Sequence, residues 1–115
     1  MVATLEQILA AQDIRHEDVP VPEWGLDVRV RVMTGTERDA FGAALVGAGN
    51  KPDMTQYRLR LLASCIVGED GVPLFGANAI EQLGRKSATA LDRLCKVAER
   101  LNGMAADSAE AAQGN

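Results

Sequence analysis

The stretch WGLDVRVRVMTGTERDAF, residues 24–41, changes its periodicity halfway along. Between residues 26 and 32 every second residue is apolar, which is typical of a strand that turns one face toward a core. The polar residues between them include Arg29 and Arg31, which we expect on the opposite, solvated face. The first half of this stretch therefore predicts a half-buried strand with a cationic outer face.

The second half of the stretch predicts a helix. Thr34 and Glu37 have the spacing of a capping box, in which each side chain accepts a hydrogen bond from the other residue's backbone N–H. We expect the helix to continue to about Val46, because GAGNKPD at 47–53 combines several helix-breaking residues. The chain thus passes from strand to helix without a long loop.

Another strand is predicted before this one. Val19 and Val21 alternate with polar residues and prolines, and proline lacks the N–H that a central strand needs, so this strand should lie at a sheet edge. PEWG at 22–25 favours a turn that joins the two strands into a β-ribbon. Further upstream, the pattern predicts a short amphipathic helix over 4–12 with Thr4 as its cap.

A helix and a hairpin are predicted in the middle of the chain. Apolar residues at helical spacing indicate a helix over 54–66, and Asp53 and Gln56 resemble a second capping box at its start. VGEDGVPLF at 67–75 then indicates a small hairpin around its Asp-Gly turn.

The last helices complete a predicted α+β fold. A short helix should end at Gly84, and Ser87 should cap a longer helix that ends near Gly103. We predict one mainly α-helical domain over residues 1–103, with an N-terminal two-stranded ribbon and a second small hairpin. Residues 104–115 are rich in Ala, with Met104 as the only large apolar residue, so we expect a flexible tail.

Composition and charge limit the function classes. The chain has 115 residues, 47% of them apolar, and a formal net charge of −4. Because nucleic-acid affinity comes largely from Lys and Arg, we expect no nucleic-acid partner. No apolar run reaches the ~20 residues of a membrane span, and the N-terminus lacks the basic start of a secretory signal. Cys65 and Cys95 lie on apolar helical stripes, which favours buried free thiols in a reducing cytoplasm over a disulfide or a metal pair.

The sequence offers little for catalysis. His16 is the only histidine, and it lies in a polar stretch, so we expect a surface residue rather than a catalytic base. Zinc would need His16, Cys65 and Cys95 from scattered positions, without the close spacing of structural zinc ligands. The segments 47–50 and 68–71 lack the full patterns of phosphate and calcium loops. We therefore predict no enzyme, no cofactor and no metal.

Three residues of the ribbon allow a partner-binding interpretation. Arg29 and Arg31 could meet an acidic or phosphate partner, although solvated positions opposite a core face are the plainer interpretation. Trp24 is the only tryptophan. It either covers the apolar face of the ribbon or anchors a partner, a role for which tryptophan is enriched.

Three segments carry a family pattern: VPEWGLDVRVRVMTGTERDAF at 21–41, YRLRLLASCIVGEDGVPLF at 57–75 and LGRKSATALDRLCKVAERLNG at 83–103. Together they resemble the tail assembly chaperones of long-tailed bacteriophages and related prophages. The resemblance follows the chain in order from Leu5 to Gly103 and contains no catalytic motif.

This resemblance implies a late, non-virion protein that acts in the cytoplasm of the bacterial host. Such chaperones bind the long tape measure protein, keep it soluble and help the tail-tube protein to polymerise around it. They tend to self-associate. In many members a ribosomal frameshift near the end of the gene yields a longer form, which the Ala-rich tail would suit. No motif fixes the contact residues, so our candidates are Trp24, Arg29, Arg31 and Met104.

Two other classes compete with this interpretation. A β-ribbon beside short helices superficially suggests a winged helix, so a small DNA-binding regulator is the alternative. The acidic charge and the lack of a basic recognition helix count against it. An enzyme built on His16 or the cysteines is the third class.

Overall fold

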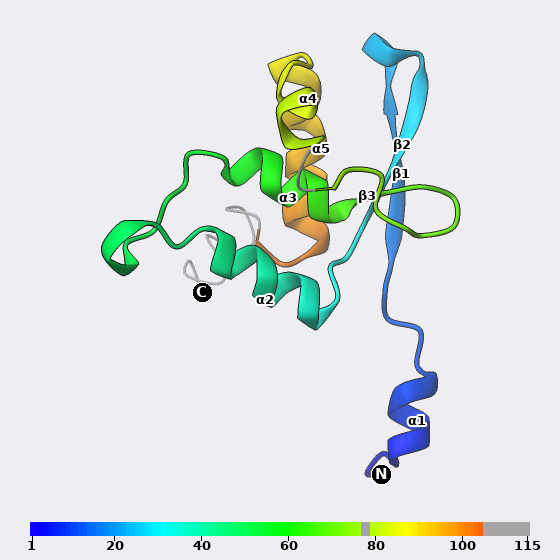
Figure 1. Cartoon of the computed structure of the whole chain (residues 1–115). Helices are drawn as coiled ribbons and strands as arrows, with labels where there is room; N and C mark the ends of the chain where they lie inside the picture. The colour runs from blue at the N-terminus through cyan, green and yellow to red at the C-terminus, as the bar shows by residue number, and fades with distance from the viewer. Residues whose placement is uncertain (77–78, 105–115) are drawn as a thin grey trace, which may run out of the picture.

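The computed structural model describes residues 1–76 and 79–104 of the chain. Over these residues the helices and strands are α1 (Leu5–Ala10), β1 (His16–Val21), β2 (Leu26–Arg31), α2 (Gly35–Ala44), α3 (Tyr57–Cys65), β3 (Ile66–Val67), α4 (Ile80–Gly84) and α5 (Ala88–Leu101). Short 3₁₀ turns lie at Pro22–Trp24 and Ala48–Asn50. The predicted α+β, mainly helical fold is confirmed (Figure 1).

The predicted ribbon is present as β1 and β2. The two strands pair antiparallel, from His16 opposite Arg31 to Val21 opposite Leu26. Pro20 lies in β1, which is an edge strand of the sheet order β1-β2-β3, as its missing N–H requires.

The third strand, β3, was not predicted to join the ribbon. Ile66 and Val67 pair antiparallel with Val30 and Arg29 of β2. The hairpin expected at 67–75 is reduced, because its returning side forms only an isolated bridge between Val67 and Pro73. The described residues therefore form a three-stranded antiparallel sheet rather than a ribbon and a separate hairpin.

The core lies between one face of the sheet and the helices α3 and α5, which pack on each other and both contact β2. Its buried residues include members of the ribbon (Val19, Val21, Val28, Val30), of α3 (Leu61, Leu62, Cys65) and of α5 (Ala90, Leu91, Leu94, Cys95, Ala98), and Met33, Phe41, Ile66 and Leu83 complete the cluster. Burying a side chain of Val or Leu size stabilises a fold by about 1.5–3 kcal/mol. Both cysteines are buried and free, as predicted.

Local capping signals were predicted correctly at three helices. The hydroxyl of Thr34 accepts the N–H of Glu37 at 3.2 Å, and the carboxylate of Glu37 accepts the N–H of Thr34 at 2.9 Å. Thr4 forms the same kind of box with Gln7 at the start of α1. Ser87 caps α5. These caps satisfy backbone donors that have no partner inside a helix.

The second capping box, predicted at Asp53 and Gln56, is wrong. The carboxylate of Asp53 instead accepts hydrogen bonds from the N–H and the hydroxyl of Thr55. This local turn satisfies the Asp53 side chain before the helix begins. As a result, α3 starts at Tyr57, three residues later than predicted.

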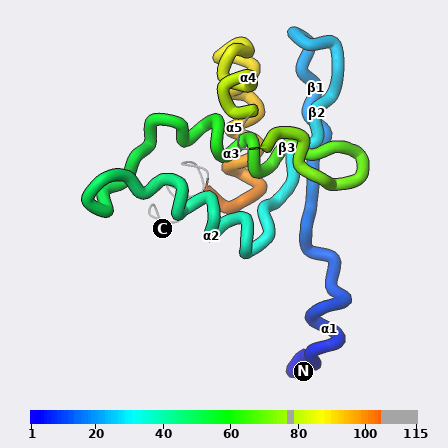
Figure 2. The backbone as a smooth tube through the Cα atoms, in the orientation of Figure 1, coloured from blue at the N-terminus to red at the C-terminus, as the bar shows by residue number. Residues whose placement is uncertain are grey.

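Helix α1 stands apart from the rest of the fold (Figure 1 and Figure 2). Within the described part of the chain, none of its six residues is buried. Its apolar residues Leu5, Ile8 and Leu9 are 67%, 62% and 75% exposed. The sequence predicted this helix and its apolar face, but nothing in the described residues covers that face.

The end of α5 is fixed to the body of the domain. Asn102 accepts the backbone N–H of Met33 at 2.8 Å and donates to the carbonyl of Ala98 at 2.8 Å. Gly103 follows with a φ of +68°, which glycine adopts without strain. Met104, expected in the tail, is half-buried and packs against the core. The other tail positions, 105–115, lie outside the described residues.

Candidate partner-binding site

A groove of about 970 Å³ opens between the tip of the β1–β2 ribbon, the loop at 68–75 after β3, and α4. In Figure 1 the ribbon tip and α4 lie at the same end of the molecule, and the loop passes across the ribbon below them. The groove therefore combines segments that are far apart in the sequence.

Of the helices that the structure describes, none is long and apolar enough to cross a membrane.

The groove has an apolar floor and apolar walls. The floor consists of the buried residues Val28, Ile66, Val67 and Leu83. The walls include two half-buried aromatic residues, Trp24 and Phe75, and two exposed leucines, Leu26 (53%) and Leu74 (62%). Exposed leucines beside a buried apolar floor are typical of a surface that binds another polypeptide.

The rim of the groove is acidic. It carries four acids and two bases: Asp18, Glu23, Asp27, Glu69, Arg29 and Lys86. Arg29 pairs with Asp18 at 2.7 Å, and Arg93 of α5 pairs with Glu23 at 2.7 Å. Neither Asp27 nor Glu69 forms an ion pair with another described residue.

The two ion pairs keep their carboxylates charged. The hydrogen bond from Arg29 lowers the pKa of Asp18, and the hydrogen bond from Arg93 lowers the pKa of Glu23. Both carboxylates are therefore anionic at neutral pH, and each is neutralised by its arginine. The excess of negative charge at the rim comes from Asp27 and Glu69, which outnumber Lys86.

The position of Trp24 fits both interpretations that the sequence allowed, a cover over apolar residues and an anchor for a partner. It packs against the apolar core, as a cover over the end of the ribbon would. It also lines the groove, where the ammonium of Lys86 lies 5.8 Å from the centre of its ring. Its role in binding a partner stays a prediction.

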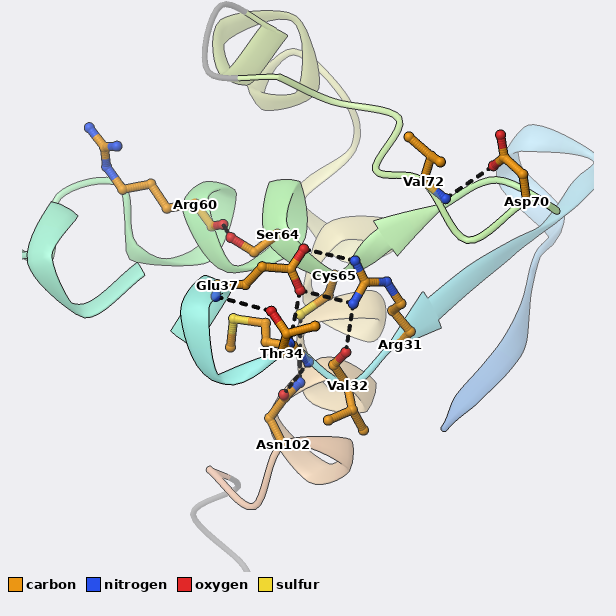
Figure 3. A network of polar contacts seen from close by, with 11 residues as sticks. Arg31, Val32, Thr34, Glu37, Arg60, Ser64, Cys65, Asp70, Val72 and Asn102 are labelled. Carbon is orange, nitrogen blue, oxygen red and sulfur yellow. Dashed lines mark hydrogen bonds and ion pairs between the residues drawn. The ribbon is translucent and has the colours of Figure 1, made fainter. Parts of the chain in front are cut away.

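Arg29 lies on the outer face of the ribbon, as predicted, but Arg31 does not lie in solvent. Arg31 is only 8% exposed. Its Nη1 donates to the carbonyl of Val32 at 3.0 Å and to Glu37 at 2.9 Å, and its Nη2 donates to Glu37 at 2.8 Å (Figure 3). The prediction of a wet, cationic outer face is therefore wrong at this position, because the chain that leaves β2 for α2 brings Glu37 over the guanidinium.

Glu37 holds a charge inside this network. Partial burial raises the pKa of its carboxyl, but hydrogen bonds from Arg31 and from the N–H of Thr34 outweigh that effect, so the pKa lies below its usual value. The ion pair is therefore maintained at neutral pH. Arg31 thus connects β2 to α2 and does not contribute to the groove.

The other candidates for chemistry are not brought together. His16 is exposed on the edge strand. Burial raises the pKa of both the Cys65 and the Cys95 thiol to about 11, so neither is an activated nucleophile. In residues 1–76 and 79–104, no group of three or more His, Cys, Asp or Glu side chains could hold a metal ion.

The family model for phage tail assembly chaperones matches residues 5–114 of the chain. The chain belongs to this family. Among solved structures, the tail assembly chaperone of bacteriophage HK97 is similar, with a TM-score of 0.59 and 27% sequence identity over 84% of this chain and 91% of that one. No curated protein sequence matches significantly.

Membership of the phage tail assembly chaperone family confirms the resemblance seen in the sequence. It does not favour the alternative of a DNA-binding regulator. A tail assembly chaperone needs a surface for protein partners, and the apolar groove with its acidic rim is our candidate for that surface.

Sequence reasoning missed most of the groove of this tail assembly chaperone. Leu26 was predicted to face the core, because it shares the alternation of Val28 and Val30, but it lies at the ribbon tip and is exposed. Leu74 and Glu69 lie in a loop whose path depends on the pairing of β3 with β2. In the sequence, the apolar residues Val72 and Leu74 directly after the Asp70-Gly71 turn are the one local signal that could have indicated this wall of the groove.

Proposed function

We propose that this tail assembly chaperone binds the tape measure protein of its phage, keeps it soluble until the tail tube forms around it, and does so without catalysis in the cytoplasm of the bacterial host. The tail-tube protein is the second partner that we propose. Self-association, which the resemblance implies, stays a prediction that sedimentation would test.

The proposal rests on the apolar groove, found in a chain that belongs to the tail assembly chaperone family. A client with exposed apolar segments aggregates unless those segments are covered, and the groove offers an apolar floor with two exposed leucines to cover them. The acidic rim keeps the chaperone itself soluble and discourages indiscriminate binding of acidic proteins.

Of the four contact residues proposed from the sequence, two lie in the groove. Trp24 and Arg29 line it, and we propose direct contact with the client for these two. Arg31 is buried in its ion pair and Met104 packs against the core. We therefore propose that these two act only by maintaining the fold.

Co-expression with the tape measure protein of the same phage tests the proposal. The chaperone should raise the soluble yield of the tape measure protein and co-purify with it. The groove variant Leu26→Asp/Leu74→Asp should lose both effects. A matched control, Leu5→Asp/Leu9→Asp, places the same charges on exposed leucines of α1 outside the groove and should retain them. An insoluble tape measure protein that does not co-purify with the unaltered chaperone would rule the proposal out.

A further inference from the structure

The groove contains an incomplete strand edge. β3 pairs only with Arg29 and Val30 of β2, and the chain then turns away after Val67. The preceding residues of β2, 26–28, all line the groove. On the β3 side, these three residues have no strand partner among the residues that the structure describes.

The hydrogen-bond pattern of the ribbon shows which backbone groups face the groove. The N–H of Val32 donates to the carbonyl of Arg15 at 2.9 Å, so these two residues form a hydrogen-bonded pair. Such pairs alternate with non-hydrogen-bonded pairs along an antiparallel ladder. By this alternation Pro20 and Asp27 form a non-hydrogen-bonded pair, which agrees with the missing N–H of Pro20.

Asp27 therefore points its backbone N–H and C=O away from β1. Arg29, two residues further on, points the same way and pairs with β3. At Asp27 the next rung of that ladder is open, and no described residue forms a backbone hydrogen bond with it there. An open rung beside an apolar groove is a site at which an extended peptide can add to a sheet.

We propose that this groove binds an extended segment of a partner polypeptide, in which two apolar residues flank one Lys or Arg, by adding it to β2 at Asp27. The residue opposite Asp27 would share the outer face of the sheet, where the Asp27 carboxylate has no ion-pair partner among residues 1–76 and 79–104, so a basic side chain fits there. Its two neighbours would turn to the other face, toward Leu26 and the apolar floor.

The chain's own end segments have the wrong charge for this site. Residues 1–14 contain Glu6 and Asp13 but no Lys or Arg. Residues 104–115 contain Asp107 and Glu110 and likewise no Lys or Arg. A segment from either end would therefore bring like charge to an acidic rim, which favours a different polypeptide as the occupant. The identity of this polypeptide as the chaperone's client rests on the proposed function. The strand-addition site at Asp27 is argued from the structure alone.

A peptide titration tests the mode of binding, with the fluorescence of Trp24 as the signal because it is the only tryptophan and lines the groove. The probe is a seven-residue capped peptide with one Val-Lys-Val core between Gly and Ser residues. It should bind more tightly than the same peptide with Glu in place of Lys, and less tightly as salt rises. Methylating the backbone nitrogen of the Lys should weaken binding about three- to tenfold, since it removes one ladder hydrogen bond. Methylating the first Val nitrogen should have little effect.

Variants of Asp27 separate charge from backbone. Asp27→Asn removes the charge and should weaken binding several-fold and reduce the salt dependence. Asp27→Pro also removes the open N–H while leaving the β1–β2 ladder intact, and should weaken binding further. Asp39→Asn, an exposed acid of α2 outside the groove, is the matched control and should bind as the unaltered chain does. Circular dichroism checks that each variant is folded.

Several outcomes would overturn the inference. They are no response of Trp24 to millimolar peptide, equal binding of the Lys and Glu peptides, or unchanged binding by Asp27→Pro. Self-association that Asp27→Pro abolishes would mean that a second copy occupies the groove. If Asp27→Pro still solubilises the tape measure protein as the unaltered chaperone does, strand addition fails while the proposed function stands. If the peptide binds as expected but the unaltered chaperone neither solubilises the tape measure protein nor co-purifies with it, the proposed function fails and strand addition stands.

Discussion

Arg31 and Glu37 form a two-point ion pair across the junction of β2 and α2, with N–O distances of 2.9 and 2.8 Å. The same Glu37 oxygen that receives Arg31 Nη1 also accepts the backbone N–H of Thr34 at 2.9 Å. One carboxylate therefore neutralises a buried guanidinium and completes the cap of a helix. The strand and the helix that the opening sequence stretch predicted are held together by this contact.

Removing Glu37 should destabilise the fold strongly. Glu37→Ala leaves the Arg31 guanidinium buried without its counter-charge and removes half of the capping box, so we expect the free energy of unfolding to fall by about 2–3 kcal/mol. Asp39→Ala, at an exposed position in the same helix, should change it by less than about 0.5 kcal/mol. Urea unfolding followed by circular dichroism measures both. Equal losses for the two variants would contradict this account.

The contribution of Glu37 should depend on pH. Its pKa is lower in the folded chain than in the unfolded chain. The stabilisation is therefore complete above the unfolded value of about 4.3 and is lost as pH falls through the folded pKa. The difference in unfolding free energy between the unaltered chain and Glu37→Gln should be largest near pH 7 and should shrink below about pH 4.5. A difference that stays constant from pH 7 to pH 3 would show that the charge of Glu37 has no effect.

Two glycines should respond differently to replacement by alanine. Gly25, in the turn between β1 and β2, has a φ of +68°, so Gly25→Ala should lower the unfolding free energy by about 1 kcal/mol. Gly35, at the start of α2, has open space around it and no positive φ. Gly35→Ala should leave stability unchanged or raise it by up to about 1 kcal/mol. Thermal melting of the two variants compares them, and destabilisation by both would argue against a specific strain at Gly25.

Both thiols should be unreactive in the folded protein. With a pKa of about 11, each of Cys65 and Cys95 is about one-thousandth ionised at pH 8, and the thiolate is the reactive form. Ellman's reagent should therefore react slowly with the native chain and quickly with two thiols in urea. Rapid reaction of one thiol in the native chain would show that its burial is incomplete.

Features set by neighbouring residues could be predicted from the sequence. The capping box of Thr34 and Glu37, the cap at Ser87 and the edge position of Pro20 all depend on a few adjacent residues. Helix α1 was predicted for the same reason. The false box at Asp53 shows the limit, since its side chain had a closer partner in Thr55.

Features set by distant segments could not be predicted. Alternation in β2 shows which residues share a face, but not what covers the other face. Arg31 was therefore placed in solvent although Glu37 covers it; Glu37 is only six residues away, but its position depends on how α2 folds back on β2. The groove depends in the same way on the short pairing of β3 with β2 and on the position of α4, neither of which leaves a local pattern.

Helix α5 separates two ends of the domain that behave differently. Lys86 and the groove adjoin its first turn, whereas Asn102 anchors its last turn, about 20 Å away for a helix of 14 residues. A fluorescent reporter or purification handle fused after Met104 would therefore lie far from the groove. Such a fusion should leave the groove, our proposed client site, accessible while the protein is detected or purified.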